Sequence, residues 1–91
     1  MTDLQQLEQT LITHGGEVTG DALPPDFREK MDALRTAGAG SSVVIVERQS
    51  HIETATRLLG QLDDANNLVV KSQKRWIIHA ELNAVRFLDG L

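Results

Sequence analysis

The stretch SSVVIVER, residues 41–48, decides the fold, because the class of the whole chain depends on whether it is a strand or a helix. Its run of four consecutive β-branched residues favours a short buried strand. Directly after it, Ser50 and Glu53 have the spacing of a capping box, in which a serine hydroxyl and a glutamate carboxylate satisfy free amides at a helix start. We therefore expect a strand over 43–48 and a central helix over 51–62.

Downstream of this helix, the sequence favours a β-hairpin. The segment DDANN, residues 63–67, closes the helix, since an asparagine can adopt the left-handed conformation of a helix end. Adjacent valines within 68–72 favour a strand, and the alternation over 75–80 is typical of a strand that returns beside it. We therefore expect a hairpin near 68–80.

Two periodicities compete in the residues after the hairpin turn. Alternation places Trp76 and Ile78 on one strand face, which would bury the only tryptophan of the chain. Helical spacing instead aligns Ile78 with Leu82. We favour a strand to about Ala80 and then a helix to Leu88, because Trp-Ile-Ile prefers strands whereas AELNAVRFL prefers a helix.

Upstream of SSVVIVER, two amphipathic helices are predicted. The first, over 2–14, places three leucines on one face and ends at a glycine pair. The second, over 26–37, places a phenylalanine, a methionine and a leucine on its inner face. The expected fold is therefore a single α+β domain over 1–91, with N-terminal helices, a central helix, a small β-sheet that includes the hairpin near 68–80, and a C-terminal helix.

Composition limits the class of protein further. The 91 residues suit one domain with an aliphatic core, since aromatic residues make up 3% of the chain. There is no cysteine, which excludes disulfides, zinc–thiolate sites and thiol catalysis. The N-terminus lacks the basic start and apolar run of a signal peptide, and the longest apolar run is too short to span a bilayer. We expect a cytoplasmic protein that does not enter a membrane.

Charge is unevenly placed along the chain, whose net charge is −4. Residues 1–40 carry seven acids and three bases, whereas residues 41–91 carry six of each. Three bases and no acid lie between Asp64 and Glu81, and we name them the basic tip: Lys71, Lys74 and Arg75. The N-terminal half would repel a polyanion, while the basic tip is a candidate binding site for one.

The sequence offers little that points to catalysis. Its histidines, His14, His51 and His79, lack the paired spacing of metal ligands. AGAGSS, residues 37–42, follows a helix and lacks the Lys-Ser or Lys-Thr of a phosphate-binding loop, so it is interpreted as a helix end and a turn. We expect a protein that is not an enzyme and that uses no metal and no cofactor.

A weaker signal for an anion site depends on how the predicted strands pair. If they lie parallel around the helix over 51–62, their ends bring three polar side chains to a helix N-terminus, which favours anions: Arg48, Ser50 and Lys71. The alternative is an ordinary solvent-exposed sheet edge, because neither strand end carries a glycine-rich turn.

Several features of residues 50–91 occur together: Leu59-x-x-Leu62-x-x-Ala65, a Val-Val strand, the basic tip, and the returning Arg75-Trp76-Ile77-Ile78. In this combination the segment resembles the recognition helix, wing and C-terminal helix of winged helix-turn-helix regulators. The resemblance implies that Arg57 and Gln61 face base edges in a major groove and that the basic tip contacts phosphates. That family has a helix, not a strand, before its recognition helix. A helix over residues 43–48 would therefore favour the resemblance, and a paired strand there would count against it.

Two functions from different classes follow. The first is a non-enzymatic regulatory, adaptor or inhibitor module that binds another protein, with a homodimer expected through the C-terminal VRFLDGL. The alternative is a winged-helix DNA-binding transcriptional regulator that uses the helix over 51–62 and the basic tip over 71–75. Steep salt dependence of binding to duplex DNA distinguishes them.

Overall fold

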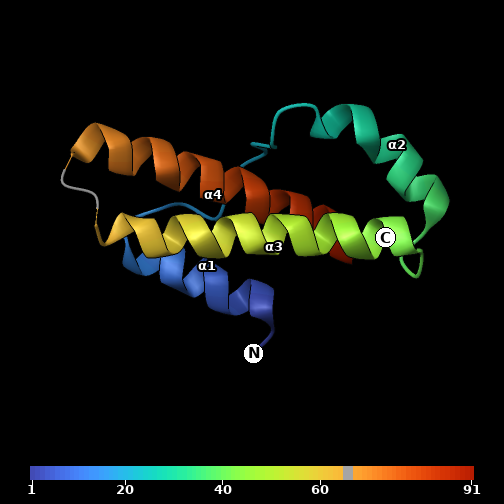
Figure 1. Ribbon diagram of the computed structural model, residues 1–91, viewed down its shortest axis with the longest axis horizontal. Helices are drawn as coiled ribbons and strands as arrows, with labels where there is room; N and C mark the ends of the chain where they lie inside the picture. Colours follow the sequence, from blue (N-terminus) through green and yellow to red (C-terminus); the bar gives the residue numbers. More distant parts are fainter. Residues whose placement is uncertain (65–66) are drawn as a thin grey trace.

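The computed structural model describes residues 1–64 and 67–91, and every regular element in these residues is a helix. The elements are α1 (Asp3–Thr13), α2 (Phe27–Ala37), α3 (Ser42–Leu62) and α4 (Leu68–Asp89). The two long helices, α3 and α4, lie side by side and antiparallel, with α1 against both of them and α2 at the other end of α3 (Figure 1). None of these four helices combines the length and the apolar character that crossing a membrane requires.

The predicted α+β class is wrong, and the first reason lies in SSVVIVER. This stretch forms the first turns of α3, where the Ser41 hydroxyl accepts a hydrogen bond from the amide of Val44 at 3.4 Å. Val44 is buried against α2 and α4, but the other three β-branched residues of the run are exposed. A central strand would bury both of its faces, whereas here only one residue in four faces inward. Packing and capping have outweighed β propensity.

The predicted hairpin near 68–80 is also wrong, because the whole segment belongs to α4. The Asn67 side chain caps this helix and accepts a hydrogen bond from the amide of Val69 at 2.8 Å. Burial then follows the helical period, with Ile78 and Leu82 in the core. The predicted burial of Trp76 is therefore wrong as well, since its side chain points away from the core and is 60% exposed.

The predicted start of the central helix at Ser50 is wrong by two turns. Ser50 lies inside α3, where its carbonyl accepts a hydrogen bond from the Thr54 hydroxyl at 3.0 Å. The end of the predicted helix near residue 62 is confirmed. Part of the predicted DDANN turn, Ala65 and Asn66, lies outside the described residues.

The two N-terminal helices are confirmed. Thr2 caps α1 in a capping box with Gln5, and the amide of Gly16 donates to the carbonyl of Leu11 as the helix ends. Gly38, with a φ of 86°, follows α2 and allows the sharp turn into α3. Local capping signals and glycine breaks therefore located these helices to within a residue or two.

The core is aliphatic and has two clusters along the groove between α3 and α4. The first joins these helices to α1 and contains Leu11, Ala55, Leu59, Leu62, Ile78 and Leu82. The second joins them to α2 and contains Phe27, Leu34, Val44, Ala84 and Leu88. Burial of these side chains, at roughly 1.5–3 kcal/mol for each large one, is the main stabilising contribution to the fold.

The long connection between α1 and α2, residues 14–26, lies across α4 and is held by polar side chains of that helix. Arg75 donates to the carbonyl of His14 at 2.9 Å, and Arg86 donates to the carbonyl of Val18 at 3.2 Å. The buried Asn83 amide donates to the carbonyl of Ala22 at 2.8 Å and to that of Gly20 at 3.4 Å. We call this segment the clamped loop, because four of its backbone carbonyls are fixed to one helix.

Candidate functional site

The first three turns of α4 carry large hydrophobic side chains on their solvent side. Side chains four and seven positions apart share one side of a helix, so Val69, Gln73 and Trp76 lie in a stripe opposite the core-facing Ile78. Val70 and Ile77 extend the stripe on one flank, and both are exposed. We call these solvent-facing residues the Trp76 face: Val69, Val70, Gln73, Trp76 and Ile77.

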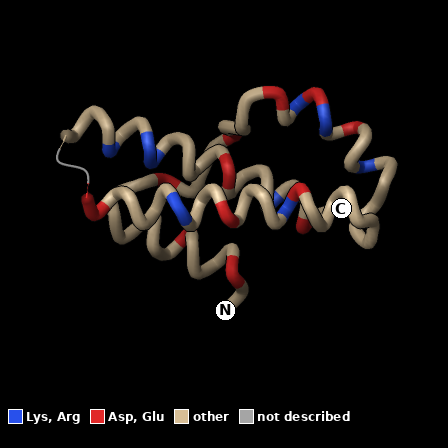
Figure 2. The backbone as a smooth tube through the Cα atoms, in the orientation of Figure 1, with Lys and Arg blue, Asp and Glu red and all other residues tan. Residues whose placement is uncertain are grey.

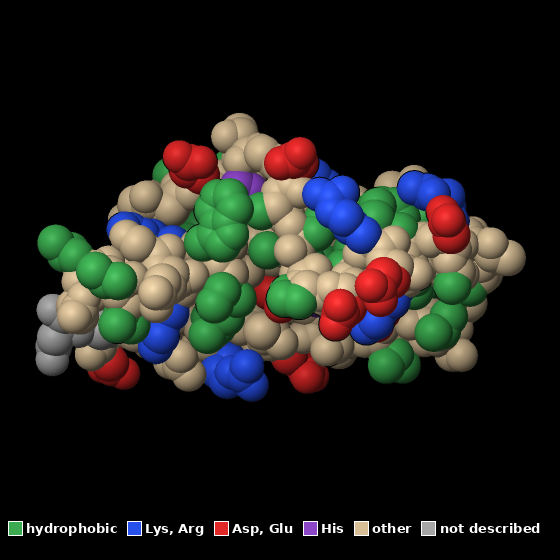
Figure 3. Space-filling model, turned by 90° about the horizontal axis from the view of Figure 1, so that it is seen from above, with side chains coloured by type: hydrophobic (Ala, Val, Ile, Leu, Met, Phe, Trp, Pro, Cys, Tyr) green, Lys and Arg blue, Asp and Glu red, His purple; other side chains and the backbone are tan. Residues whose placement is uncertain are grey.

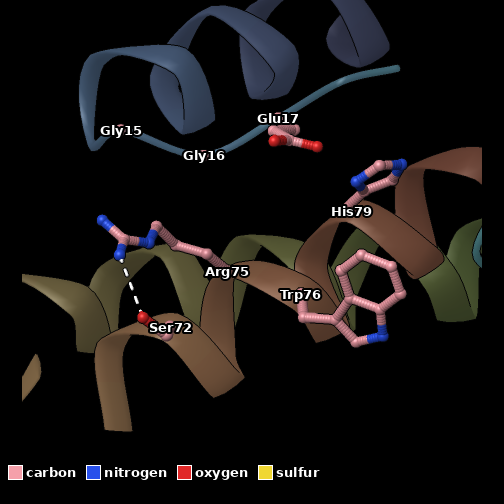
Figure 4. A pocket seen from close by; sticks show the side chains of 7 residues that line it. All are labelled: Gly15, Gly16, Glu17, Ser72, Arg75, Trp76 and His79. Carbon is pink, nitrogen blue, oxygen red and sulfur yellow. Dashed lines mark hydrogen bonds between the residues drawn. The ribbon is translucent and has the colours of Figure 1, made fainter. Parts of the chain in front are cut away.

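The clamped loop builds a wall on each side of Trp76. On one side, Gly15, Gly16 and Glu17 face Ser72, Arg75, Trp76 and His79 across a cavity of about 210 Å³, which we call the Glu17 cavity (Figure 4). On the other side, Leu23, Pro24 and Pro25 face Trp76, Ile77, Ala80 and Glu81 across a second cavity of about 210 Å³, the proline cavity. Trp76 thus stands between a polar hollow and an apolar one.

The buried His79 side chain packs against the Trp76 ring. This side chain is 2% exposed, and its ring packs in a tilted arrangement on that of Trp76, with 5.5 Å between centroids. Gly20 covers it closely: a Cβ at this position would lie 3.3 Å from the imidazole, and the φ of Gly20 is 115°. His79 Nε2 is buried without a hydrogen-bond partner in the described residues. This contact limits how far Trp76 can tilt inward.

The basic tip is not a free cationic patch. Its three residues lie on the core side of α4, in helical register with Ile78, and are all partly buried. Lys74 donates to the Gln61 side chain at 3.0 Å, and Arg75 donates to the carbonyl of His14 at 2.9 Å and to Ser72 Oγ at 3.2 Å. Figure 2 shows the basic positions of α4 in its first turns, at the end away from the C-terminus.

The residues predicted to read DNA bases lie on α3. Arg57 is exposed, whereas Gln61 is partly buried and accepts the hydrogen bond from Lys74. The structure therefore brings Gln61 to the basic tip, but through an internal contact between two helices.

The predicted anion site is not assembled. Arg48 is engaged by two carboxylates: it donates to Asp3 at 2.8 and 2.9 Å and to Asp89 at 2.6 and 3.2 Å. Ser50 is exposed within α3. Lys71 lies near the opposite end of α4 from Asp89, about 27 Å away at 1.5 Å per residue. The strand crossover that would have joined these residues is absent from the described chain.

The guanidinium of Arg48 and the carboxylate of Asp3 shift each other's pKa. Its hydrogen bonds lower the pKa of Asp3 from 3.8 to about 2, and the two carboxylates raise the pKa of Arg48. Because Asp3 begins α1 and Asp89 ends α4, this ion pair ties three helices together. Its role is structural.

A buried histidine holds a second ionic cluster. His51 lies in α3 with one ring nitrogen bonded to Glu81 and the other to Glu47 at 3.0 Å, and its ring meets Phe27 edge-on. Burial lowers the pKa of His51, but hydrogen bonds and charges from Glu81 and Glu47 outweigh this effect and raise it above 6.5. Lys30 pairs with Glu47 at 3.4 Å. With both nitrogens occupied and the ring buried, His51 is poorly placed to transfer a proton to a substrate.

Nor is a metal centre formed in the described part of the chain. There, no group of three or more side chains of His, Cys, Asp or Glu is arranged so that it could hold a metal ion. The apolar side chains of the predicted dimer segment VRFLDGL are also largely used within the chain, since Val85 and Leu88 are buried in the core.

No protein-family model, curated protein or solved structure matches this chain. Function is therefore inferred from the geometry around Trp76. Sequence reasoning missed Trp76 as a surface residue, and it missed Glu17 and the two prolines as its neighbours. Helical spacing from Lys71 to Leu82 is the signal that would have placed Trp76 outside, since it sets the lysines and Ile78 on the other side of the helix.

Proposed function

We propose that the protein is a non-enzymatic regulatory module that binds another protein through the Trp76 face. The observation that carries this proposal is an exposed tryptophan between two cavities, both walled by the clamped loop. Tryptophan is the residue type most enriched at the energetic centres of protein interfaces, where a large ring is buried among complementary side chains.

The apolar surroundings of Trp76 support the same proposal. Val69 is 63% exposed and Ile77 is 45% exposed, on the same side of α4. Single exposed hydrophobic residues are common, but a contiguous group with flanking hollows is typical of a binding surface. Figure 3 shows several hydrophobic side chains close together on this face of the molecule, with acidic and basic side chains around them.

Support for a non-catalytic role comes from the titratable groups. His51, which is bonded to two carboxylates, is buried with both of its ring nitrogens occupied. The lack of cysteine suits the reducing cytoplasm, where we propose that the module acts.

The proposal is tested by capturing partners from native lysate with the intact chain and identifying them by mass spectrometry. A specific partner should be retained by the wild type and by Ile45→Ala, which truncates an exposed hydrophobic residue of α3 outside the face. It should be lost with Trp76→Ala. With the purified partner, Trp76→Ala should weaken binding by at least about tenfold, as truncation of a central interface residue does. Equal affinity of both variants would contradict the proposal.

Binding of DNA as a winged-helix regulator stays a prediction. Residues 43–48 are helical, but they are continuous with 51–62 in α3, whereas that family has a separate helix before its recognition helix. Against this prediction, the segment that should form the wing is part of α4, and two of the three residues of the basic tip, Lys74 and Arg75, are engaged internally. Binding to random duplex DNA that falls steeply with salt would support this alternative, and no binding at low salt would exclude it.

A further inference from the structure

The two cavities beside Trp76 differ in polarity, and this difference limits which partner side chains they can accept. The proline cavity is lined mainly by apolar groups, from Leu23, Pro24 and Ile77. It suits an aliphatic side chain. The Glu17 cavity has a more polar lining, which includes Glu17, Ser72 and Arg75.

Arg75 is the cationic side chain that lines the Glu17 cavity, but it is turned to the far end. Figure 4 shows its guanidinium directed toward Gly15 and bonded to Ser72, away from Trp76 and His79. A second hydrogen bond, to the carbonyl of His14, holds it there. An anion entering beside Trp76 would therefore meet Glu17 before it met a free cation.

The near end of the Glu17 cavity has the groups that a cation prefers. Glu17 is an exposed carboxylate that forms no ion pair with any described residue. The face of an exposed indole ring attracts ammonium and guanidinium groups, most strongly among the aromatic side chains. His79 holds that ring in place. A lysine or arginine side chain between Glu17 and Trp76 would be stabilised by both.

From this geometry we propose that the partner contributes an amphipathic helix with a lysine or arginine beside its apolar stripe. Its apolar side chains lie along Val69, Ile77 and the proline cavity, and its cation enters the Glu17 cavity between Glu17 and Trp76. This inference rests on the proposed protein-binding function and adds the chemistry of the partner. The charge of the first 40 residues, seven acids against three bases, would also attract a basic segment at long range.

The test uses two synthetic peptides that lack tryptophan and share one leucine stripe. One carries lysines and the other glutamates at the flanking positions. Binding is measured by the fluorescence of Trp76, the only tryptophan in the chain. The Leu/Lys peptide should bind at least about tenfold more tightly than the Leu/Glu peptide at low salt.

The variant Glu17→Gln tests whether the preference for the Leu/Lys peptide arises in the Glu17 cavity. It should reduce the preference for the Leu/Lys peptide about two- to fivefold, the size expected for the loss of one exposed charge pair. The control, Glu29→Gln, removes the same charge from an exposed position of α2 that does not line the cavity, and should leave the preference unchanged.

Three outcomes would overturn the inference. An equal effect of both substitutions would mean that net charge alone attracts the peptide. If both peptides bound equally tightly and both changed the fluorescence of Trp76, the partner would not need a basic side chain, but the Trp76 face would still be the docking surface. Binding of neither peptide would exclude the helix described above, and the lysate experiment would still decide the proposed function independently.

Discussion

At the scale of single residues, the environment of Trp76 is the largest departure from expectation. In a strand, Trp76 and Ile78 would share a face, but in a helix they lie on opposite sides. The structure follows the helix, so the tryptophan is available for binding and the isoleucine is fully buried.

Truncation of the two side chains should separate these roles. Trp76→Ala should lower the free energy of unfolding by less than about 1 kcal/mol, since an exposed side chain loses few contacts. Ile78→Ala should lower it by about 3 kcal/mol because it leaves a cavity in the core. Urea denaturation followed by circular dichroism measures both, and a large loss for Trp76→Ala would place its ring in the core instead.

The cluster at His51 predicts how stability depends on pH. Its pKa is raised in the folded chain above the ordinary 6.5, so the folded state holds the proton more tightly than the unfolded state. The resulting stabilisation is fully present below about pH 6.5 and is lost as pH rises through the folded pKa. Unfolding free energies should therefore fall as the pH rises from about 6.5 through the folded pKa of His51.

A second histidine serves as the comparison for this measurement. The pKa of His14 is also raised, chiefly by its hydrogen bond to Asp63, but that carboxylate is 76% exposed and screened by water. His51→Gln should remove most of the pH dependence and His14→Gln only a small part. The reverse order would show that the buried cluster is not protonated as described.

At the scale of the elements, the sequence predicted α1 and α2 but not the character of α3 and α4. The first two helices have strong local signals, such as the capping box at Thr2 and the glycines that end each helix. In α3 and α4, β-branched residues stand at helix starts, where Ser41 and Asn67 can equally be residues of a turn. Helix formation there depends on packing between elements that are distant in sequence, and local helix propensity does not include this contribution.

Substitutions at the start of α3 test this balance. Val46 is exposed on the helix, so Val46→Ala should raise the free energy of unfolding by about 0.5 kcal/mol through better helix propensity. Val44→Ala, at a buried position two residues earlier, should lower it by about 2 kcal/mol. Thermal or urea unfolding distinguishes the signs. In a buried strand, both substitutions would be destabilising.

At the scale of the whole molecule, the candidate site depends on contacts between segments far apart in the chain. Glu17 and Pro24 reach Trp76 only because side chains of α4 hold the clamped loop, including Asn83, which bonds a carbonyl 61 residues away. No local pattern in the sequence encodes such a contact. The sequence prediction placed a hairpin over 68–80; the helical spacing around Ile78 could have indicated an amphipathic helix there, but not the walls that the clamped loop adds.

Asn83 therefore offers a test of the site that does not touch its surface. Asn83→Ala should cost about 1–2 kcal/mol of unfolding free energy, since it removes two partly buried hydrogen bonds to the clamped loop. It should also weaken binding of the partner, because the walls beside Trp76 are no longer fixed. Amide hydrogen exchange in residues 14–26 should be faster in this variant than in the wild type, which measures the loosening of the clamped loop locally. Exchange at the wild-type rate, with partner affinity unchanged, would show that the loop is held by other contacts.

The ion pair at Arg48 has a consequence for protein engineering. One guanidinium contacts Asp3 near the start of the chain and Asp89 near its end, so the segments that carry these two residues lie close together. A short glycine-rich linker can then join them, and the chain can be reopened at the exposed turn around Gly40, where an added Cβ would meet no neighbour. Such a circular permutant would turn the order α1–α2–α3–α4 into α3–α4–α1–α2 while keeping every helix contact in place.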